Sequence, residues 1–354
     1  MPKVFLFGYY GFGNLGDELL RAYYTNLLRD HFPASQLFVL LHSDQAPKEK
    51  EATGYTAVNR WCLWRLSRLM APGDLLLGGG GSIFQDLTSQ RSLLYYLALL
   101  HLARRRRVAI ILAGQGIGPL SPWGQKVAGP VLNQAAIITC RDQESFTALQ
   151  EMGVKNPLLY PGVDPLWDYP VPPLPTVAAS GAASRVVGYI FRPGDLQTKK
   201  TLLKALNARF GGLRLLVFAP GDEQPAQRLA GELGLAPPQT IGNLADFMTL
   251  VPEQSIIISQ RLHGLLLAAR YGLPGVGLSD DPKIHAFCRQ MQWPCWGWSE
   301  QGLCAKVITA VASGVSGGDG VTQRIRRQTA GMAQKGEEDR QWLLQQLRTV
   351  LPGR

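Results

Sequence analysis

Cysteine is scarce in this chain and lacks the spacings typical of stapled or metal-binding proteins. The five cysteines (Cys62, Cys140, Cys288, Cys295 and Cys304) are odd in number and include no C-x-x-C pair. A disulfide framework and a zinc site are therefore not expected. We predict reduced thiols in a cytoplasmic protein and no bound metal.

Long apolar runs are also missing. The most apolar stretch, SLLYYLALLHLA at 92–103, contains His101 and is too short to span a hydrocarbon layer of about 30 Å. The N-terminal run MPKVFLFGYYGFG becomes glycine-rich too soon for a signal peptide. We expect a strand at the start of the chain and a buried or interfacial helix at 92–103.

Acidic residues are too few to balance the basic ones. The chain has 36 Lys and Arg residues but only 26 Asp and Glu residues, which gives a net charge of +10 and a pI near 9.5. The excess favours an anionic partner, such as phosphate, nucleic acid or an acidic membrane. No zinc-finger spacing or RNP-like strand is present, so nucleic acid is not expected. The dense run Arg104–Arg107 either completes a solvated helix C-terminus or contacts anionic lipid headgroups.

What the chain does have is an alternation of short apolar runs and helical patterns, which predicts parallel sheets built from βαβ units. Its 354 residues suggest two domains. Helices are expected near 18–30, 92–103, 145–152, 195–209, 222–233, 264–271 and 283–291. Strands are expected at KVFLFG, QLFVLLH, DLLLGG, RVAIILAG, AAIITC, PLLYPG, RVVGYIF, LRLLVFAP, SIIISQ and LPGVGLS.

The alternation disappears over residues 161–184, which are rich in Pro, Ala, Ser and Gly and therefore mark a domain boundary. We predict an α/β fold with two doubly wound, Rossmann-like domains, at 1–165 and 185–330. They would face a cleft lined by the carboxyl ends of both sheets. Residues 313–336 are again rich in Gly, Ser and Thr, and an amphipathic helix at 337–351 could pack back on the first domain.

The loop after the first strand, GYYGFGNLGDE, contains the G-x-G-x-x-G outline of a dinucleotide turn at 11–16. Asp17 and Glu18 follow at the first turn of a helix, where their carboxylates would repel a pyrophosphate. The acidic ribose ligand expected about 20 residues later is also absent. Asp17 could be a helix N-cap; alternatively, the turn presents Asn14, Asp17 and Glu18 to the cleft.

Three further strands of the first domain end in polar or glycine-rich loops. Four glycines that include Gly80 and Gly81 could serve a crowded domain contact or leave backbone N–H groups open to a ligand. Gln115 is the polar group of the loop GQGIGPL. Arg141 could be a planar fork for a carboxylate or phosphate, or a structural partner of an acidic neighbour. The candidate structural partners are Asp142 and Glu144.

In the second domain, the strand SIIISQ runs into Arg261, Leu262 and His263, and an apolar helix starts at once. Free N–H groups at a helix start, a guanidinium and an imidazole together suit an anion. His263 is also placed for proton transfer, although a single histidine is often structural. His285 fits packing or surface exposure better.

These segments together resemble the polysaccharide pyruvyl transferase family, especially its CsaB-like bacterial branch. The matching motifs are GYYGFGNLGDE, GGGGSIFQD, GQGIGPL, RDQES, QRLHGLLLA and GLSDDPK. The resemblance implies a fold like that of two-domain GT-B glycosyltransferases, and transfer of a pyruvyl group from phosphoenolpyruvate to a sugar as a ketal. It assigns phosphoenolpyruvate binding to Arg141, Arg261, Leu262 and His263. Asp280 departs from the family pattern, which has an aromatic residue there.

We therefore expect a transferase with phosphoenolpyruvate as donor substrate and no cofactor. His263 would be the acid, Asp17 the base or hydroxyl-orienting group, and a nucleotide- or lipid-linked saccharide the acceptor. Gln115, Asn14, Glu18, Gly80 and Gly81 would line the substrate site. The basic charge would favour peripheral contact with the inner face of the membrane. The alternatives are a GT-B glycosyltransferase with a nucleotide-sugar donor, and a polyanion- or sugar-binding module.

Overall fold

The computed structural model describes residues 1–42, 54–172 and 186–351. Its contacts divide the chain into two compact units. Unit 1 comprises residues 1–12, 17–169 and 333–354, and unit 2 comprises residues 13–16 and 170–332. The division at 169/170 falls within the segment 161–184, of which residues 173–184 lie outside the described part.

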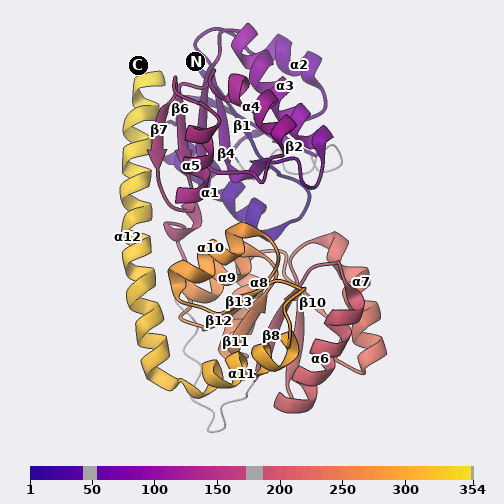
Figure 1. The fold of residues 1–354 in the computed structure, drawn as a ribbon. Helices are drawn as coiled ribbons and strands as arrows, with labels where there is room; N and C mark the ends of the chain where they lie inside the picture. Colours follow the sequence, from indigo (N-terminus) through magenta and orange to yellow (C-terminus); the bar gives the residue numbers. More distant parts are fainter. Residues whose placement is uncertain (43–53, 173–185, 352–354) are drawn as a thin grey trace. The chain divides into compact units, whose positions relative to one another are not determined.

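Unit 1 contains a seven-stranded parallel sheet in the order β3-β2-β1-β4-β5-β6-β7 (Figure 1). Its strands are β1 (Lys3–Phe7), β2 (Gln36–Leu41), β3 (Thr56–Asn59), β4 (Leu75–Phe84), β5 (Ala109–Ile117), β6 (Ile137–Cys140) and β7 (Leu158–Pro161). Its helices are α1 (Leu15–His31), α2 (Leu63–Leu69), α3 (Gln90–Arg105), α4 (Pro122–Leu132), α5 (Gln143–Glu151) and the short η1 (Pro165–Trp167). One hydrophobic cluster joins α2, α3, α4 and α5 to one face of the sheet.

Unit 2 repeats the plan with six parallel strands in the order β10-β9-β8-β11-β12-β13. The strands are β8 (Val186–Phe191), β9 (Leu213–Val217), β10 (Gln239–Thr240), β11 (Gln254–Ser259), β12 (Gly275–Leu278) and β13 (Cys295–Trp296). The helices are α6 (Leu196–Phe210), α7 (Pro220–Leu233), α8 (Leu244–Leu250), η2 (Val251–Glu253), α9 (Leu262–Arg270), α10 (Pro282–Met291) and α11 (Leu303–Ser316). The long helix α12 (Gly318–Val350) belongs to this unit up to Met332. The core lies between one face of the sheet and α6, α7 and α11, whereas α9 and α10 lie on the other side (Figure 1).

Both units are thus doubly wound and Rossmann-like, as the sequence pattern predicted. Every predicted strand is present, and most of them are apolar runs buried on both faces of a parallel sheet. The exception is β7 (Leu158–Pro161), an edge strand without a buried residue. The pattern missed β3, β10 and β13, which are two to four residues long and lie at sheet edges. Runs this short carry too little periodicity to be recognised.

The segment 313–336 is regular despite its content of Gly, Ser and Thr. It is helical almost throughout, since α11 continues to Ser316 and α12 begins at Gly318. Residues from Ala333 onward belong to unit 1, where Trp342 stacks on Tyr160 with ring centroids 4.3 Å apart. A Cβ at Gly336 would lie 3.0 Å from the backbone nitrogen of Asp168, so this glycine allows α12 to approach η1 closely. Tertiary packing here outweighs the low helix propensity of glycine.

Candidate functional site

Each sheet has one switch point, where the connections run outward in opposite directions from neighbouring strands. In unit 1 this point lies between β1 and β4, and in unit 2 between β8 and β11. Ligands of doubly wound folds bind at the carboxyl ends of the strands beside this point. The opening loop and the glycine-rich end of β4 occupy it in unit 1, and the Arg261–His263 segment occupies it in unit 2.

The opening loop closes on its own helix through Glu18. The Glu18 carboxylate accepts a hydrogen bond from the backbone N–H of Gly11 at 2.8 Å and pairs with the Arg21 guanidinium at 2.8 Å. Gly11 and Gly13 have φ values of 79° and 72°, which favour glycine. The Glu18 carboxylate therefore already occupies the N–H group of Gly11, which a phosphate bound in this loop would need as a donor. A substrate contact of Glu18 stays a prediction.

Asp17 and the glycine pair at the end of β4 lie together in unit 1. Asp17 is buried, and its Oδ1 lies 3.1 Å from the position of a Cβ at Gly81. A Cβ at Gly80 would meet both methyl groups of Leu20 at 3.2–3.3 Å. Both glycines have positive φ values, 79° and 81°. The strand end can approach the first turn of α1 only because these positions lack side chains.

The Asp17 carboxylate also lies near a buried tyrosine. Tyr10 donates a hydrogen bond from its hydroxyl to the carbonyl oxygen of Gly79 at 2.5 Å. Burial raises the pKa of Tyr10 well above its usual range, and the nearby Tyr24 and Asp17 raise it further. Tyr10 is therefore a neutral donor that fixes the glycine-rich strand end beside Asp17.

Gln115 is fully buried and contacts the sheet. Its Nε2 donates to the carbonyl oxygens of Gly78 and Ala113, both at 3.0 Å. The amide thereby connects the ends of β4 and β5, and its Oε1 has no hydrogen-bond partner among the described residues. A direct substrate contact of Gln115 stays a prediction.

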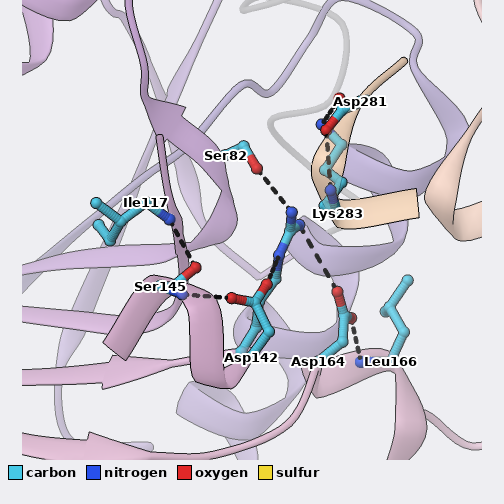
Figure 2. Close-up of polar contacts among 9 residues, drawn as sticks. Ser82, Ile117, Asp142, Ser145, Asp164, Leu166, Asp281 and Lys283 are labelled. Atoms are coloured by element: carbon cyan, nitrogen blue, oxygen red, sulfur yellow. Dashed lines mark hydrogen bonds and ion pairs between the residues drawn. The ribbon is translucent and has the colours of Figure 1, made fainter. Parts of the chain in front are cut away.

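Arg141, which follows β6, is buried among polar partners from three elements. Its guanidinium donates to Ser82 Oγ at 2.7 Å and lies 3.3 Å from Asp142 Oδ2 and 3.8 Å from Asp164 Oδ2 (Figure 2). A Cβ at Gly116 would lie 2.7 Å from Cζ of Arg141, so the guanidinium lies directly against β5. Two carboxylates flank this cation, one of them on Asp142, which was one of the two partners considered from the sequence.

Asp142 has a second role as the N-cap of α5. Its Oδ1 accepts a hydrogen bond from the backbone N–H of Ser145 at 2.7 Å, and Ser145 Oγ accepts one from Ile117 N–H at 2.9 Å (Figure 2). These bonds join the start of α5 to the end of β5. They fix the backbone that carries Arg141.

In unit 2, Arg261 occupies the N-cap position of α9 and provides no side-chain cap. The Ser259 hydroxyl fixes this turn, since Oγ accepts from Arg261 N–H at 3.0 Å and donates to the Arg261 carbonyl at 2.7 Å. The guanidinium pairs with Asp222, a buried carboxylate at the start of α7, through Nε at 3.0 Å and through Nη2. Nη1 makes no hydrogen bond to the residues that the structure describes, so it can donate to a ligand.

His263 packs against the opening loop. A Cβ at Gly16 would lie only 1.7 Å from His263 Nδ1, so the imidazole fills the space that any other residue at position 16 would need. Leu15 N–H also donates to the Phe218 carbonyl at 2.9 Å. Residues 13–16, including Asn14, consequently belong to unit 2, whereas the sequence reading placed them in the first domain. Leu262 is buried, so only its backbone could bond a ligand.

His285 has a structural environment. Its Nε2 lies 2.7 Å from the carbonyl oxygen of Ser279, to which the ring donates. Asp280 accepts a hydrogen bond from Trp298 N–H at 3.0 Å, and Asp281 caps α10 and pairs with Lys283 at 2.9 Å. These groups stabilise the loop after β12.

Sequence reasoning named Asp142 as a partner of Arg141 but missed the other two carboxylates that face the arginines. Asp164 and Asp222 are distant from Arg141 and Arg261 in the chain, and no motif links them. Among the described residues, no cluster of three or more His, Cys, Asp or Glu is arranged to hold a metal ion. None of the described helices has the length and apolar character that crossing a membrane requires.

Comparisons with known proteins agree with this fold and these motifs. The family model described as polysaccharide pyruvyl transferase matches residues 14–282. Among solved structures, HepE of Anabaena in complex with UDP-glucose has a TM-score of 0.66 at 14% identity, with 99% of this chain and 100% of that chain covered. MnaA of S. aureus in complex with UDP has a TM-score of 0.67 at 13% identity, with 99% and 97% covered. The UDP-GlcNAc 2-epimerase of Neisseria meningitidis has a TM-score of 0.61 at 11% identity, with 98% and 100% covered. A search of curated protein sequences finds no match. The structural similarities establish a GT-B-like fold.

Proposed function

Because this chain belongs to the polysaccharide pyruvyl transferase family, we propose that it moves a pyruvyl group from phosphoenolpyruvate to two hydroxyls of one sugar. The sugar would be part of a cell-wall or surface polysaccharide precursor, and the products would be a pyruvate ketal and inorganic phosphate. We also propose the CsaB-like branch, on the motifs given above. The observation that carries the proposal is the placement of Arg261 and His263 at the uncapped start of α9, beside the switch point of unit 2.

Phosphoenolpyruvate carries a carboxylate and a phosphate on one small enol. The first N–H groups of α9 and the Nη1 of Arg261 would bind one of these anionic groups. Asp222 keeps Nε and Nη2 of the same guanidinium in a fixed orientation. The family resemblance gives donor binding to Arg141 as well, and its buried position among Ser82, Asp142 and Asp164 makes its orientation equally fixed.

His263 is the proposed general acid. It would protonate the methylene carbon of phosphoenolpyruvate and leave an oxocarbenium-like C2. A sugar hydroxyl would attack C2 and lose its proton to a base, for which Asp17 is the candidate. The bond between C2 and the phosphate oxygen would then break, and a second hydroxyl of the same sugar would replace the phosphate and close the ketal.

The acceptor would be a nucleotide- or lipid-linked saccharide at the inner face of the cytoplasmic membrane. The net charge of +10 supports peripheral association with anionic lipid. In the run at 104–107, Arg106 donates to the Met70 carbonyl at 3.0 and 3.2 Å, while all four side chains are exposed at the end of α3. Sedimentation with anionic liposomes should weaken as salt rises, and salt-independent binding would contradict this association.

A GT-B glycosyltransferase with a nucleotide-sugar donor is the second candidate, favoured by the similarity to UDP-bound structures. Such a site would need a ribose-binding carboxylate in unit 2, for which Asp280 and Asp281 were the sequence candidates. Both already make the loop contacts described above. The pyruvyl transfer is therefore the better-supported function.

Phosphate release from phosphoenolpyruvate, measured over a panel of β-linked hexose acceptors, tests the proposal. Pyruvyl transfer requires release that depends on the acceptor, whereas a glycosyltransferase or a binding module releases none. The His263→Ala variant should lower turnover by roughly 10²- to 10⁴-fold. Turnover near the normal value in that variant would refute the role of His263, and transfer of a hexose from UDP-glucose would favour the second candidate.

A further inference from the structure

A buried lysine occupies a core position of α6. Leu202, Leu203 and Leu206 are fully buried on the face of α6 that packs on the sheet, and Lys199 precedes them by three, four and seven residues on the same face. Lys199 itself is 1% exposed. An ammonium group at such a position is costly unless polar partners compensate it.

The partners of Lys199 do not neutralise its charge. Nζ donates to the carbonyl oxygen of Arg192 at 2.8 Å and lies over the rings of Trp298 and Phe191, 4.8 and 5.6 Å from their centroids. No carboxylate of the described residues forms an ion pair with it. An ammonium has three donors, and one acceptor serves them here.

The charged groups nearest to Lys199 are engaged elsewhere. Asp195, at the N-cap of α6, accepts hydrogen bonds from the backbone of Gln197 and Thr198. Asp222, at the start of α7, is paired with Arg261. Arg192, in the loop after β8, adds a second positive charge. The carboxyl end of the unit 2 sheet therefore carries more positive than negative charge at this point.

The loop from Arg192 to Asp195 passes directly over the ammonium. Gly194 has a φ of 144°, and a Cβ there would lie 3.0 Å from Nζ, so a side chain would crowd the cation. Pro193, Gly194 and Asp195 are exposed. This loop follows β8, the strand whose carboxyl end lies beside β11 at the switch point, where doubly wound folds bind the phosphate of a ligand.

We propose that residues 192–194, with Lys199 beneath them, form a phosphate-binding subsite for the phosphoryl group of the donor. The Asp195 carboxylate lies outside this subsite, because it accepts hydrogen bonds from the backbone of Gln197 and Thr198 at the start of α6. The identification of the donor rests on the proposed function; the subsite for a phosphate dianion does not. Lys199 acts through the loop, as a positioning residue that holds the Arg192 carbonyl and supplies positive charge that no ion pair with a described residue neutralises. Arg261, whose Nε and Nη2 pair with Asp222, would bind the second anionic group through Nη1.

The subsite predicts a pH dependence. The pKa of Lys199 is lowered to about 8, chiefly by burial; Arg192 adds to this lowering, whereas Asp195 and Asp222 oppose it. Because the charged form attracts the anion, phosphate binds best below this pKa. Above it, affinity should fall by about tenfold per pH unit, until the bound state also loses the proton.

The test is calorimetric titration of the full chain with inorganic phosphate and with phosphoenolpyruvate, from about pH 7.5 to 9.5. In Lys199→Met we expect affinity about 10- to 100-fold weaker at pH 7.5 and no fall above pH 8. Lys199→Arg should bind phosphate well at pH 7.5, and its affinity should not fall above pH 8, because arginine stays charged. Lys200→Met is the matched control, since the Lys200 side chain is 42% exposed and pairs with Glu232 at 2.7 Å.

Wild-type affinity and pH profile in both Lys199 variants would overturn the proposal. A purely structural lysine would destabilise Lys199→Met, as thermal unfolding would show, and would leave the pH profile of Lys199→Arg unchanged. The two proposals also separate: Lys199-dependent phosphate binding without acceptor-dependent turnover would preserve the subsite and refute pyruvyl transfer. Acceptor-dependent turnover that is unchanged in the Lys199 variants would preserve pyruvyl transfer and refute the subsite.

Discussion

The contact between Gly16 and His263 gives the sharpest test of the candidate site. In a Gly16→Ala variant the new Cβ would lie 1.7 Å from Nδ1, 2.4 Å from Cγ and 2.7 Å from Cε1 of the imidazole. Carbon atoms in ordinary contact are about 3.5 Å apart, so the ring must move by roughly 2 Å. A side chain can rotate away, so we expect an unfolding free energy lower by only about 1–3 kcal/mol.

The catalytic effect should be much larger than the effect on stability. A displacement of about 1 Å can cost 10²-fold in rate, so turnover in Gly16→Ala should fall by at least about 100-fold. The assay is acceptor-dependent phosphate release, with urea unfolding in parallel. Because both changes act through one imidazole, the double variant Gly16→Ala/His263→Ala should be no slower than His263→Ala alone and should recover the lost stability.

Gly231→Ala is the matched control for this experiment. Gly231 is exposed in α7, and a Cβ there meets no atom within 4 Å. Its turnover should be unchanged, and its unfolding free energy should rise by about 0.5–1 kcal/mol. Wild-type turnover in Gly16→Ala, or a double variant markedly slower than His263→Ala, would refute the reasoning that His263 acts from its position against Gly16.

Two further substitutions test the arginines through their neighbours. Asp222→Asn removes the negative charge beside Arg261 but keeps an amide oxygen that can accept from the guanidinium and hold its orientation. Phosphoenolpyruvate should therefore bind more tightly at low salt, while the unfolding free energy falls by roughly 1–3 kcal/mol. Calorimetry and urea unfolding measure the two effects, and weaker binding would contradict the arrangement. Gly116→Ala places a Cβ 2.6 Å from Ser82 Oγ and 2.7 Å from Arg141 Cζ, and should weaken phosphoenolpyruvate binding at least about tenfold. Unchanged binding in Gly116→Ala would exclude Arg141 from the donor site.

The sequence predicted the fold well where the signal is local. Buried parallel strands are continuous apolar runs, and their glycine-rich ends are visible in the same stretch of chain. The extent of α12 was not predictable, because its glycines argue against a helix. Contacts such as the stacking of Trp342 on Tyr160 stabilise the helix, and they exist only in the folded chain.

The candidate site divides in the same way. The residue types at the strand ends, such as Arg141 and Arg261, and their position before helices follow from the sequence. Their partners distant in the chain do not, because Asp164 and Asp222 reach the guanidinium groups only after the strands have taken their order in the sheet. Lys199 left a weak trace in the sequence, as a charged residue at a core position of a helix pattern.

The sequence by itself therefore determined that the chain forms two parallel α/β units and which reactive side chains stand at their strand ends. Only the tertiary structure decided which charges are compensated: Arg141 and Arg261 face the buried carboxylates of Asp164 and Asp222, whereas Lys199 faces a carbonyl and two aromatic rings. It also brought Gly16 against His263. The physical reason is that periodicity and chain geometry act between near neighbours, whereas charge pairing and close packing act through space between residues distant in the chain.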